Sequence, residues 1–140
     1  MEIITGSDIL SSEKINLTLR YSVQRQTLVV SVHQIEGLYS DDTRGIYVKL
    51  YLLPERHKNT KRKTQVIKSL KNPTFDETFE FSIPQDELFD QQLEVSVWEE
   101  GMIRNEPIEK VVIDLDKLGL VLPHRRLFKL SKVANGTNES

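Results

Sequence analysis

The side chains best able to do chemistry in this chain are cations gathered between Tyr47 and Pro73. One acid, Glu55, stands among them, and the cations are Lys49, Arg56, Lys58, Lys61, Arg62, Lys63, Lys68 and Lys71. Ammonium and guanidinium groups that lie close together attract anions through charge and hydrogen bonds. We therefore interpret this stretch as a binding surface and not as a catalytic centre.

Two predicted strands joined by a turn position these cations. Strand alternation places Tyr47 and Lys49 on the face opposite Val48. After the turn, Lys61 and Lys63 repeat the alternation. Lysines from neighbouring strands can then converge on one anion, while the other face packs into a core.

Strand-like segments separated by turn signals recur along the whole chain. Two short helical turns are predicted at Gln85–Phe89 and Asp116–Leu120. The eight predicted strands are Ile15–Ser22, Thr27–His33, Ile46–Leu53, Arg62–Lys68, Glu77–Ile83, Leu93–Trp98, Ile108–Asp114 and Arg126–Leu130. Alternation within several of them is typical of sheets with one solvated face. The pattern predicts an all-β fold, an eight-stranded antiparallel β-sandwich.

Length and composition predict one domain with flexible ends. A chain of 140 residues can bury about two-thirds of its unfolded surface and fold alone. We expect a folded domain at residues 14–131, a flexible N-terminal flank at 1–13 and a flexible C-terminal tail at 132–140. The sequence contains no cysteine, no apolar run near 18 residues and no leader-like start. These features predict a cytoplasmic location without a transmembrane helix.

Charge is unevenly distributed along the chain, although the net charge is only -2. Residues 56–71 contain seven Lys or Arg and no acid, whereas residues 76–116 contain thirteen acids and two cations, Arg104 and Lys110. A single charged run is usually a solvated face. Segregation of the two signs favours a binding role for the basic stretch.

Five motifs follow one another along the chain: YVKLYLLPE, KRKT, NPTFDETFEF, VSVWEE and RRLFKL. Together they resemble the C2 domains of synaptotagmins, extended synaptotagmins and conventional protein kinases C, and the resemblance covers about Lys14 to Leu130. It implies an eight-stranded antiparallel β-sandwich with the synaptotagmin-type strand order. It also implies a peripheral membrane-binding module of a larger protein, located on the cytosolic face of a membrane.

The resemblance also implies how this chain differs from members that bind calcium. The positions that carry aspartate in those members fall here on Tyr39, Gly45, Glu99, Gly101 and Glu106. Calcium needs about six to eight oxygen ligands, so the loss of three carboxylates leaves the ion undercoordinated. Three acids in the same loops are partial substitutes: Asp41, Asp42 and Glu100. We predict binding that is largely independent of calcium, with no metal site and no other cofactor.

A second family site, a lysine-rich cluster on a sheet face, is present in full. The resemblance places it on Tyr47, Lys49, Lys61, Lys63, Trp98 and Asn105. Several cationic and amide donors beside two aromatic rings can neutralise phosphates and stack on an inositol ring. The predicted partners are an anionic phospholipid membrane and a bis-phosphorylated phosphoinositide headgroup within it.

The basic stretch also fits functions other than lipid binding. A protein-interaction module whose basic face binds an acidic partner stays open, because a lysine patch attracts any polyanion. Nucleic acid is not a predicted partner, since the acidic half would repel an extended backbone and no recognition motif is present. An enzyme is not predicted either. His33, His57 and His124 are far apart in sequence, and none is beside an acid that would orient a catalytic base.

Overall fold

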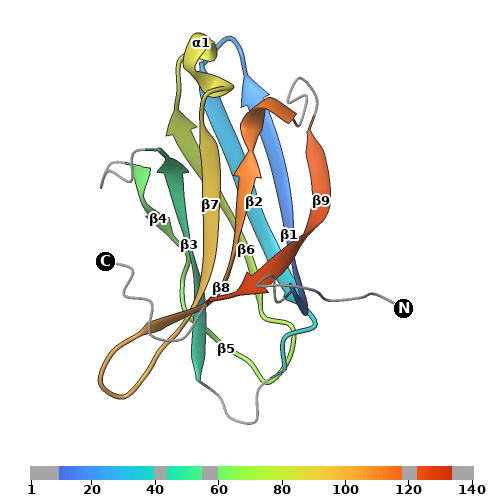
Figure 1. Ribbon diagram of the computed structural model, residues 1–140, viewed down its shortest axis with the longest axis vertical. Helices are drawn as coiled ribbons and strands as arrows, with labels where there is room; N and C mark the ends of the chain where they lie inside the picture. The colour runs from blue at the N-terminus through green and yellow to red at the C-terminus, as the bar shows by residue number, and fades with distance from the viewer. Residues whose placement is uncertain (1–9, 40–43, 55–59, 118–122, 134–140) are drawn as a thin grey trace.

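The computed structural model describes residues 10–39, 44–54, 60–117 and 123–133, and they form an antiparallel β structure (Figure 1). Within these residues the strands are β1 (Leu10–Ser22), β2 (Thr27–Glu36), β3 (Gly45–Leu53), β4 (Arg62–Lys63), β5 (Ile67–Lys68), β6 (Thr74–Ser82), β7 (Gln92–Glu99), β8 (Glu106–Asp114) and β9 (His124–Lys132). Two short helices are α1 (Gln85–Leu88) and η2 (Leu115–Lys117). None of the helices in the described residues is long and apolar enough to cross a bilayer.

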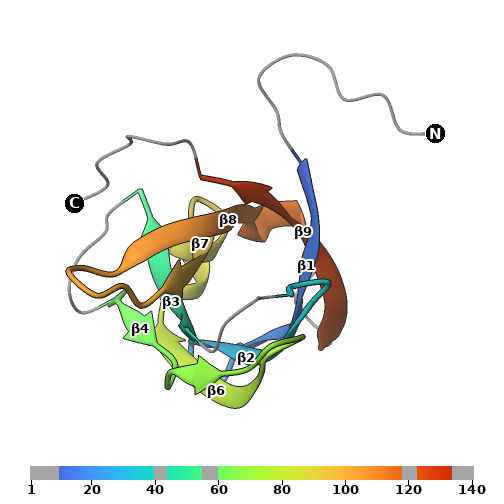
Figure 2. The same cartoon turned by 90° about the horizontal axis from the view of Figure 1, so that it is seen from below.

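The strands build a sandwich that is nearly closed into a barrel (Figure 2). Hydrogen-bonded neighbours follow the order β4-β3-β7-β8-β9-β1-β2-β6, and β5 also pairs with β3. One layer holds β4, β5, β3, β7 and β8, and the other holds β9, β1, β2 and β6. At the seam, the Arg62 guanidinium of β4 donates to the Glu80 carbonyl of β6 through Nε and Nη2, at 3.2 and 2.8 Å. The predicted antiparallel sandwich is confirmed.

Strand alternation fills the space between the layers with aliphatic side chains. Val48 and Leu50 of β3, Val95 and Val97 of β7, and Leu17 of β1 are all fully buried in one core cluster. The residues between them on each strand point outward, because successive side chains of a strand alternate faces. The outer face of β3 and β7 is therefore available for a binding site.

The predicted strand Arg62–Lys68 is wrong as one continuous element. It is divided into β4 and β5 because Thr64 turns inward between them and is buried. Thr64 Oγ1 accepts a hydrogen bond from the Val48 amide at 2.9 Å, and the Thr64 amide donates to the Val48 carbonyl at 2.9 Å. The described residues therefore contain nine strands where eight are predicted, although the architecture is the same.

The remaining predicted elements agree with the structure apart from their ends. Strand β1 begins at Leu10, within the predicted flank, and Leu10 pairs with Ser131 of β9. Helix α1 lies within the predicted turn at Gln85–Phe89, and η2 overlaps the start of the predicted turn at Asp116–Leu120. Residues 1–9, 118–122 and 134–140 lie outside the described residues.

An asparagine ties together the loops at the end of the sandwich where β3 begins. Asn72 has a positive φ of 46°, a conformation that asparagine tolerates better than most residues. Its Oδ1 accepts from the Gly37 amide at 2.8 Å, and its own amide donates to the Leu38 carbonyl at 2.9 Å. These bonds hold the start of the β2–β3 loop against the turn before β6. We call this end of the sandwich the apical end.

Candidate functional site

Three strands and two loops carry the six predicted lipid-binding residues, which we call the lysine cluster. Tyr47 and Lys49 lie on β3, Lys63 on β4 and Trp98 on β7, while Lys61 precedes β4 and Asn105 lies in the β7–β8 loop. Tyr47 pairs in register with Trp98, and Lys49 pairs with Lys63. Residues that are paired across neighbouring strands share a face, so the register places four of the six together on the outer face.

The two aromatic rings of the lysine cluster stack, and two ammonium groups lie over them. The ring centroids of Tyr47 and Trp98 are 6.2 Å apart, with an interplanar angle of 16°. Lys49 Nζ lies 3.8 Å from the centroid of Trp98, and Lys63 Nζ lies 4.4 Å from the centroid of Tyr47. Each contact is within the range of a cation–π interaction. The rings therefore hold both cations on the same part of the sheet.

Tyr47 is more enclosed than expected of a residue that stacks on a ligand. Only 2% of Tyr47 is exposed, because Trp98, Lys49 and Lys63 cover it. Burial raises the pKa of the Tyr47 hydroxyl; its side-chain hydrogen bond with Asn105 lowers that pKa, and the charge of Glu100 raises it further. Tyr47 thus supports the two lysines and connects them to the β7–β8 loop through Asn105.

The other two members of the lysine cluster differ in how they are held. Trp98 is half-buried, and its Nε1 donates to Ser96 Oγ at 2.9 Å, which fixes the indole against β7. Lys61 is exposed. Within the described residues, its side chain makes no contact with the aromatic rings of Tyr47 and Trp98 like those of Lys49 and Lys63. The structure therefore brings five of the six together and leaves Lys61 at the margin.

A fourth lysine, Lys110, lies on the same face and was missed from the sequence. Ser96 of β7 pairs with Lys49 on one side and with Lys110 of β8 on the other. The row across the sheet therefore reads Lys63, Lys49, Ser96, Lys110. In the sequence Lys110 is an isolated cation in an acidic stretch, so only the strand register could reveal it.

Lysines directly opposite each other create a charge imbalance on this face. Like charges at directly paired positions destabilise a sheet by a few tenths of a kcal/mol to about 1 kcal/mol. Lys49 and Lys63 are such a pair. A negatively charged group close to both lysines would offset this repulsion.

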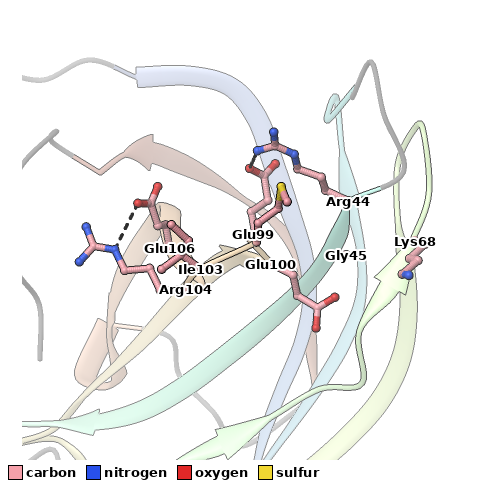
Figure 3. A pocket seen from close by; sticks show the side chains of 10 residues that line it. Arg44, Gly45, Lys68, Glu99, Glu100, Ile103, Arg104 and Glu106 are labelled. Atoms are coloured by element: carbon pink, nitrogen blue, oxygen red, sulfur yellow. Dashed lines mark hydrogen bonds and ion pairs between the residues drawn. The ribbon is translucent and has the colours of Figure 1, made fainter.

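At the apical end, arginines neutralise the acids that stand at the expected calcium positions (Figure 3). Arg44 Nη1 lies 3.2 Å from Glu99 Oε1, and Arg104 Nε lies 3.5 Å from Glu106 Oε1. These four residues line an open pocket with a volume of about 620 Å³. Each of these two carboxylates therefore has a cation beside it.

At Gly45, where the family resemblance places a calcium-binding aspartate, a side chain would require its neighbours to move. A Cβ atom on Gly45 would collide with the Glu100 carboxylate and with a methyl group of Val66. The Glu100 amide donates to the Gly45 carbonyl at 2.8 Å, which holds the loop there. No group of three or more His, Cys, Asp or Glu side chains suited to a metal occurs in the described residues. Asp41 and Asp42 lie outside the described residues.

Two apolar side chains at the tip of the β7–β8 loop were also missed from the sequence. Met102 and Ile103 are about fully exposed, at 104% and 99%. The loop extends outward to the side at the lower end of the sandwich (Figure 1). An apolar pair between Gly101 and Arg104, in a loop that is otherwise polar, is the sequence signal that indicates such a surface contact.

His33 has neighbours that the sequence did not indicate. Its Nε2 lies 2.7 Å from Thr18 Oγ1, and its Nδ1 lies 3.8 Å from Asp76 Oδ1. The second distance is too long for a hydrogen bond, so Asp76 does not orient the ring as it would a catalytic base. His57 and the side chain of His124 lie outside the described residues.

Comparison with known proteins agrees with the fold and the motifs. The family model of the C2 domain matches residues 26–130. Human extended synaptotagmin-3 is 35% identical over 135 residues, which is 91% of this chain and 15% of that protein. Rat synaptotagmin-6 is 40% identical over 108 residues, which is 74% of this chain and 21% of that protein.

A solved structure shows the same architecture. The crystal structure of a C2 domain of RIM from Drosophila superposes with a TM-score of 0.78 at 28% identity, and the match covers 84% of this chain and 97% of that domain. The chain spans only about a tenth to a fifth of the length of the curated relatives it matches. From the family model, these relatives and this fold together, we conclude that the chain belongs to the C2 domain family.

Proposed function

We propose that this C2 domain is a peripheral membrane-binding module of a larger protein, which binds bis-phosphorylated phosphoinositides on the cytosolic face of a membrane. The observation that carries the proposal is the directly opposed pair Lys49 and Lys63, each held over an aromatic ring. Two cations at one point of a sheet face are suited to a ligand with two phosphates.

The expected affinity follows from the charges. A lysine near an anionic membrane surface contributes about 1 kcal/mol. Lys49, Lys61, Lys63 and Lys110 would therefore contribute about 4 kcal/mol, and contact with the Trp98 ring about 1 kcal/mol more. A total of about 5 kcal/mol corresponds to a dissociation constant of roughly 0.2 mM.

Calcium independence is part of the proposal, and the apical arginines support it. In a calcium-binding site, carboxylates gather around an ion that offsets their charge. Here Arg44 and Arg104 lie against Glu99 and Glu106 and provide that positive charge from within the chain. The loops should therefore approach an anionic bilayer whether or not calcium is present.

The exposed loop tip indicates how the domain would sit on the bilayer. Met102 and Ile103 lie in the same loop as Asn105, which is hydrogen-bonded to Tyr47 of the lysine cluster. The lysine cluster and the loop tip can therefore meet one membrane together. In that orientation the cations contact headgroups while the two apolar side chains enter the interface.

Vesicle flotation tests this function. Vesicles with and without a bis-phosphorylated phosphoinositide are compared at two salt concentrations, each with calcium and with chelator. We expect binding that requires the phosphoinositide, weakens steeply with salt and is unchanged by chelator. Equal binding to neutral vesicles, or binding abolished by chelator, would reject the proposal. Retention by an acidic protein with no lipid binding would favour the interaction module instead.

A further inference from the structure

Met102 carries the one sulfur atom in the described residues. The sequence contains two methionines and no cysteine, and the other methionine is Met1, which lies outside the described residues. Thiols and thioethers are the side-chain groups that peroxides oxidise. Within the described residues, oxidation at sulfur is therefore confined to a single position, at the tip of the β7–β8 loop.

The described residues leave this thioether open to solvent. Met102 is 104% exposed, which is as much as a side chain in an extended peptide exposes. The oxidation of sulfur follows its exposure, because an oxidant must reach the atom. We therefore expect Met102 to react with a peroxide within about threefold of the rate of a short methionine peptide.

The backbone on either side holds Met102 and Ile103 at the tip. A Cβ atom on Gly101 would collide with the Arg104 carbonyl oxygen, so the chain folds back closely at this point. After the tip, Arg104 Nε lies 3.5 Å from Oε1 of Glu106, the residue where β8 begins. The two apolar residues are thus presented by a closely turned segment, and neither belongs to the core.

Oxidation of Met102 would change the polarity of the tip and not its charge. A thioether is apolar, whereas a sulfoxide carries an oxygen that accepts hydrogen bonds from water. Moving a polar group out of water without a new partner is unfavourable. Met102 and Ile103 are the apolar pair that enters the bilayer interface in the proposed function. The sulfoxide would therefore remove about half of that apolar contact.

We propose that Met102 is a reversible oxidation site, and that its conversion to methionine sulfoxide by a peroxide weakens the binding of the domain to a membrane. This regulation rests on the proposed function, because it acts on the contact of the loop tip with the bilayer. The unoxidised domain binds, and the oxidised domain binds more weakly although its lysine cluster is unchanged. Methionine sulfoxide reductases, one for each epimer, return Met102 to the binding form.

The oxidation step is a two-electron transfer of oxygen. A lone pair of the Met102 sulfur attacks one oxygen of hydrogen peroxide, the O–O bond breaks, and a sulfur–oxygen bond forms. The departing hydroxide takes the proton from the transferred oxygen and leaves as water. Sulfur is oxidised by two electrons, and the peroxide is reduced by the same two electrons.

The lysine cluster supplies an internal reference for this effect. Asn105, which is hydrogen-bonded to Tyr47, lies three residues beyond Met102, and oxidation of Met102 alters no member of the cluster. Affinity for a soluble inositol bisphosphate should therefore stay constant while affinity for a bilayer falls. A damaged or unfolded domain would lose both.

Vesicle flotation before and after treatment with hydrogen peroxide tests the proposal. Peptide mass spectrometry gives the fraction of sulfoxide at Met102 and at Met1 separately. We expect affinity for vesicles that contain a bis-phosphorylated phosphoinositide to fall about fivefold, which is the share of one of the two apolar side chains at the tip. Calorimetric titration with a soluble inositol bisphosphate should change by less than about twofold. Treatment with both reductases should restore flotation.

Two variants separate Met102 from every other group that a peroxide could oxidise. Met102→Leu keeps an apolar tip without sulfur, and its affinity after peroxide should equal its own affinity before peroxide. This comparison accounts for oxidation elsewhere, including at Met1 and Trp98. Met102→Gln places an uncharged polar chain at the tip, as the sulfoxide does, and should show the affinity of the oxidised chain without any peroxide. Melting temperature shows whether each protein is folded.

The outcomes distinguish the two proposals. If the unoxidised, unaltered chain does not float with phosphoinositide vesicles, the proposed function fails, and regulation through Met102 fails with it. If that chain floats and the chain with Met102 sulfoxide floats equally well, only the regulation is overturned. An equal loss of affinity in Met102→Leu after peroxide, or sulfoxide at Met1 with none at Met102, also overturns the regulation and leaves the proposed function standing.

Discussion

Replacing both opposed lysines of the lysine cluster, Lys49→Met with Lys63→Met, is the most direct perturbation of the proposed site. Methionine keeps an unbranched apolar chain in contact with the rings of Tyr47 and Trp98 while it removes the charge. The variant therefore changes the electrostatics of the face more than its packing.

The expected loss in binding is about 2 kcal/mol, or roughly 30-fold, at about 1 kcal/mol for each lysine. The stability of the fold should change less, because two effects oppose each other. Each cation–π contact removed costs about 0.5 to 1 kcal/mol at a partly exposed site. Relief of the repulsion between Lys49 and Lys63 returns up to about 1 kcal/mol. We expect a net destabilisation between about zero and 2 kcal/mol, which lowers the melting temperature by a few degrees.

Calorimetric titration with a soluble inositol bisphosphate, in the presence of chelator, measures this binding without a membrane. The matched control is Lys14→Met with Lys129→Met, which removes a directly opposed lysine pair of the same geometry from the other layer. It should leave headgroup affinity within about twofold, since a single soluble ligand cannot occupy both faces. Full affinity in the Lys49 and Lys63 variant, or an equal loss in the control, would refute the reasoning.

Two further predictions concern the loop tip and the buried tyrosine. Met102→Ser with Ile103→Ser should lower affinity for phosphoinositide vesicles about 30-fold, because each side chain that enters the bilayer interface contributes about 1 kcal/mol. The affinity for the soluble headgroup, measured by titration, should stay unchanged. An equal loss of affinity in both assays would contradict membrane insertion. The raised pKa of Tyr47 means that the folded state favours the protonated hydroxyl. The contribution of this hydroxyl to the free energy of unfolding is therefore complete below pH 10 and is lost as the pH rises through the folded pKa. The variant Tyr47→Phe lacks the hydroxyl and has no such dependence on pH. The gap in unfolding free energy between Tyr47→Phe and the unaltered chain, measured with urea at pH 8 and above pH 10, should therefore narrow, whereas a constant gap would argue against it.

The fold is largely predictable because the alternation of apolar and polar residues that marks a β-strand is a local property of the sequence. The alternation of Val95 and Val97 with polar neighbours identifies β7 without any tertiary information. What the alternation cannot show is an interruption such as that at Thr64, whose side chain pairs with the backbone of Val48 from another strand. Strand ends are equally dependent on partners, as the extension of β1 to Leu10 opposite Ser131 shows.

The lysine cluster is predictable in membership but not in arrangement. The family motifs identify Lys49 and Lys63, but only the register between β3 and β4 shows that they are directly opposed. Lys110 joins their row through the pairing of β7 with β8, which contains a register shift between Val97 and Trp98. A shift of one residue moves every later side chain to the other face, so no reading of β8 alone could place Lys110.

Burial and ion pairs are likewise properties of the assembled domain. Tyr47 was expected to stack on a ligand, yet neighbours from three strands cover its ring. Arg44 and Glu99 are 55 residues apart in sequence and form an ion pair only because two loops meet at the apical end. The sequence predicted binding largely independent of calcium from the missing ligands, and the structure adds an arginine beside two of the remaining acids, Glu99 and Glu106.

In the folded domain, the acidic and basic stretches of the sequence are not equally exposed on the surface. Many acids of residues 76–116 are held inside or paired: Glu94 and Glu109 are buried, Glu80 pairs with Arg25, and Glu99 pairs with Arg44. The net charge of -2 therefore does not describe the face that carries the lysine cluster.

A domain of this kind should associate quickly with anionic surfaces and leave them quickly. Its cations are mostly exposed, so their attraction is screened beyond a Debye length of about 8 Å at physiological salt. A contact worth about 5 kcal/mol is too weak for long residence on a membrane by itself. The matched part of this chain spans only about a tenth to a fifth of the length of two of its relatives. A second membrane-binding segment in one polypeptide would raise the apparent affinity by effective concentration, by about a hundredfold or more. A tandem chain should therefore remain on phosphoinositide vesicles at salt concentrations that release the single domain. Nanomolar, salt-insensitive binding by the single domain would mean that apolar burial, and not charge, dominates its contact with the membrane.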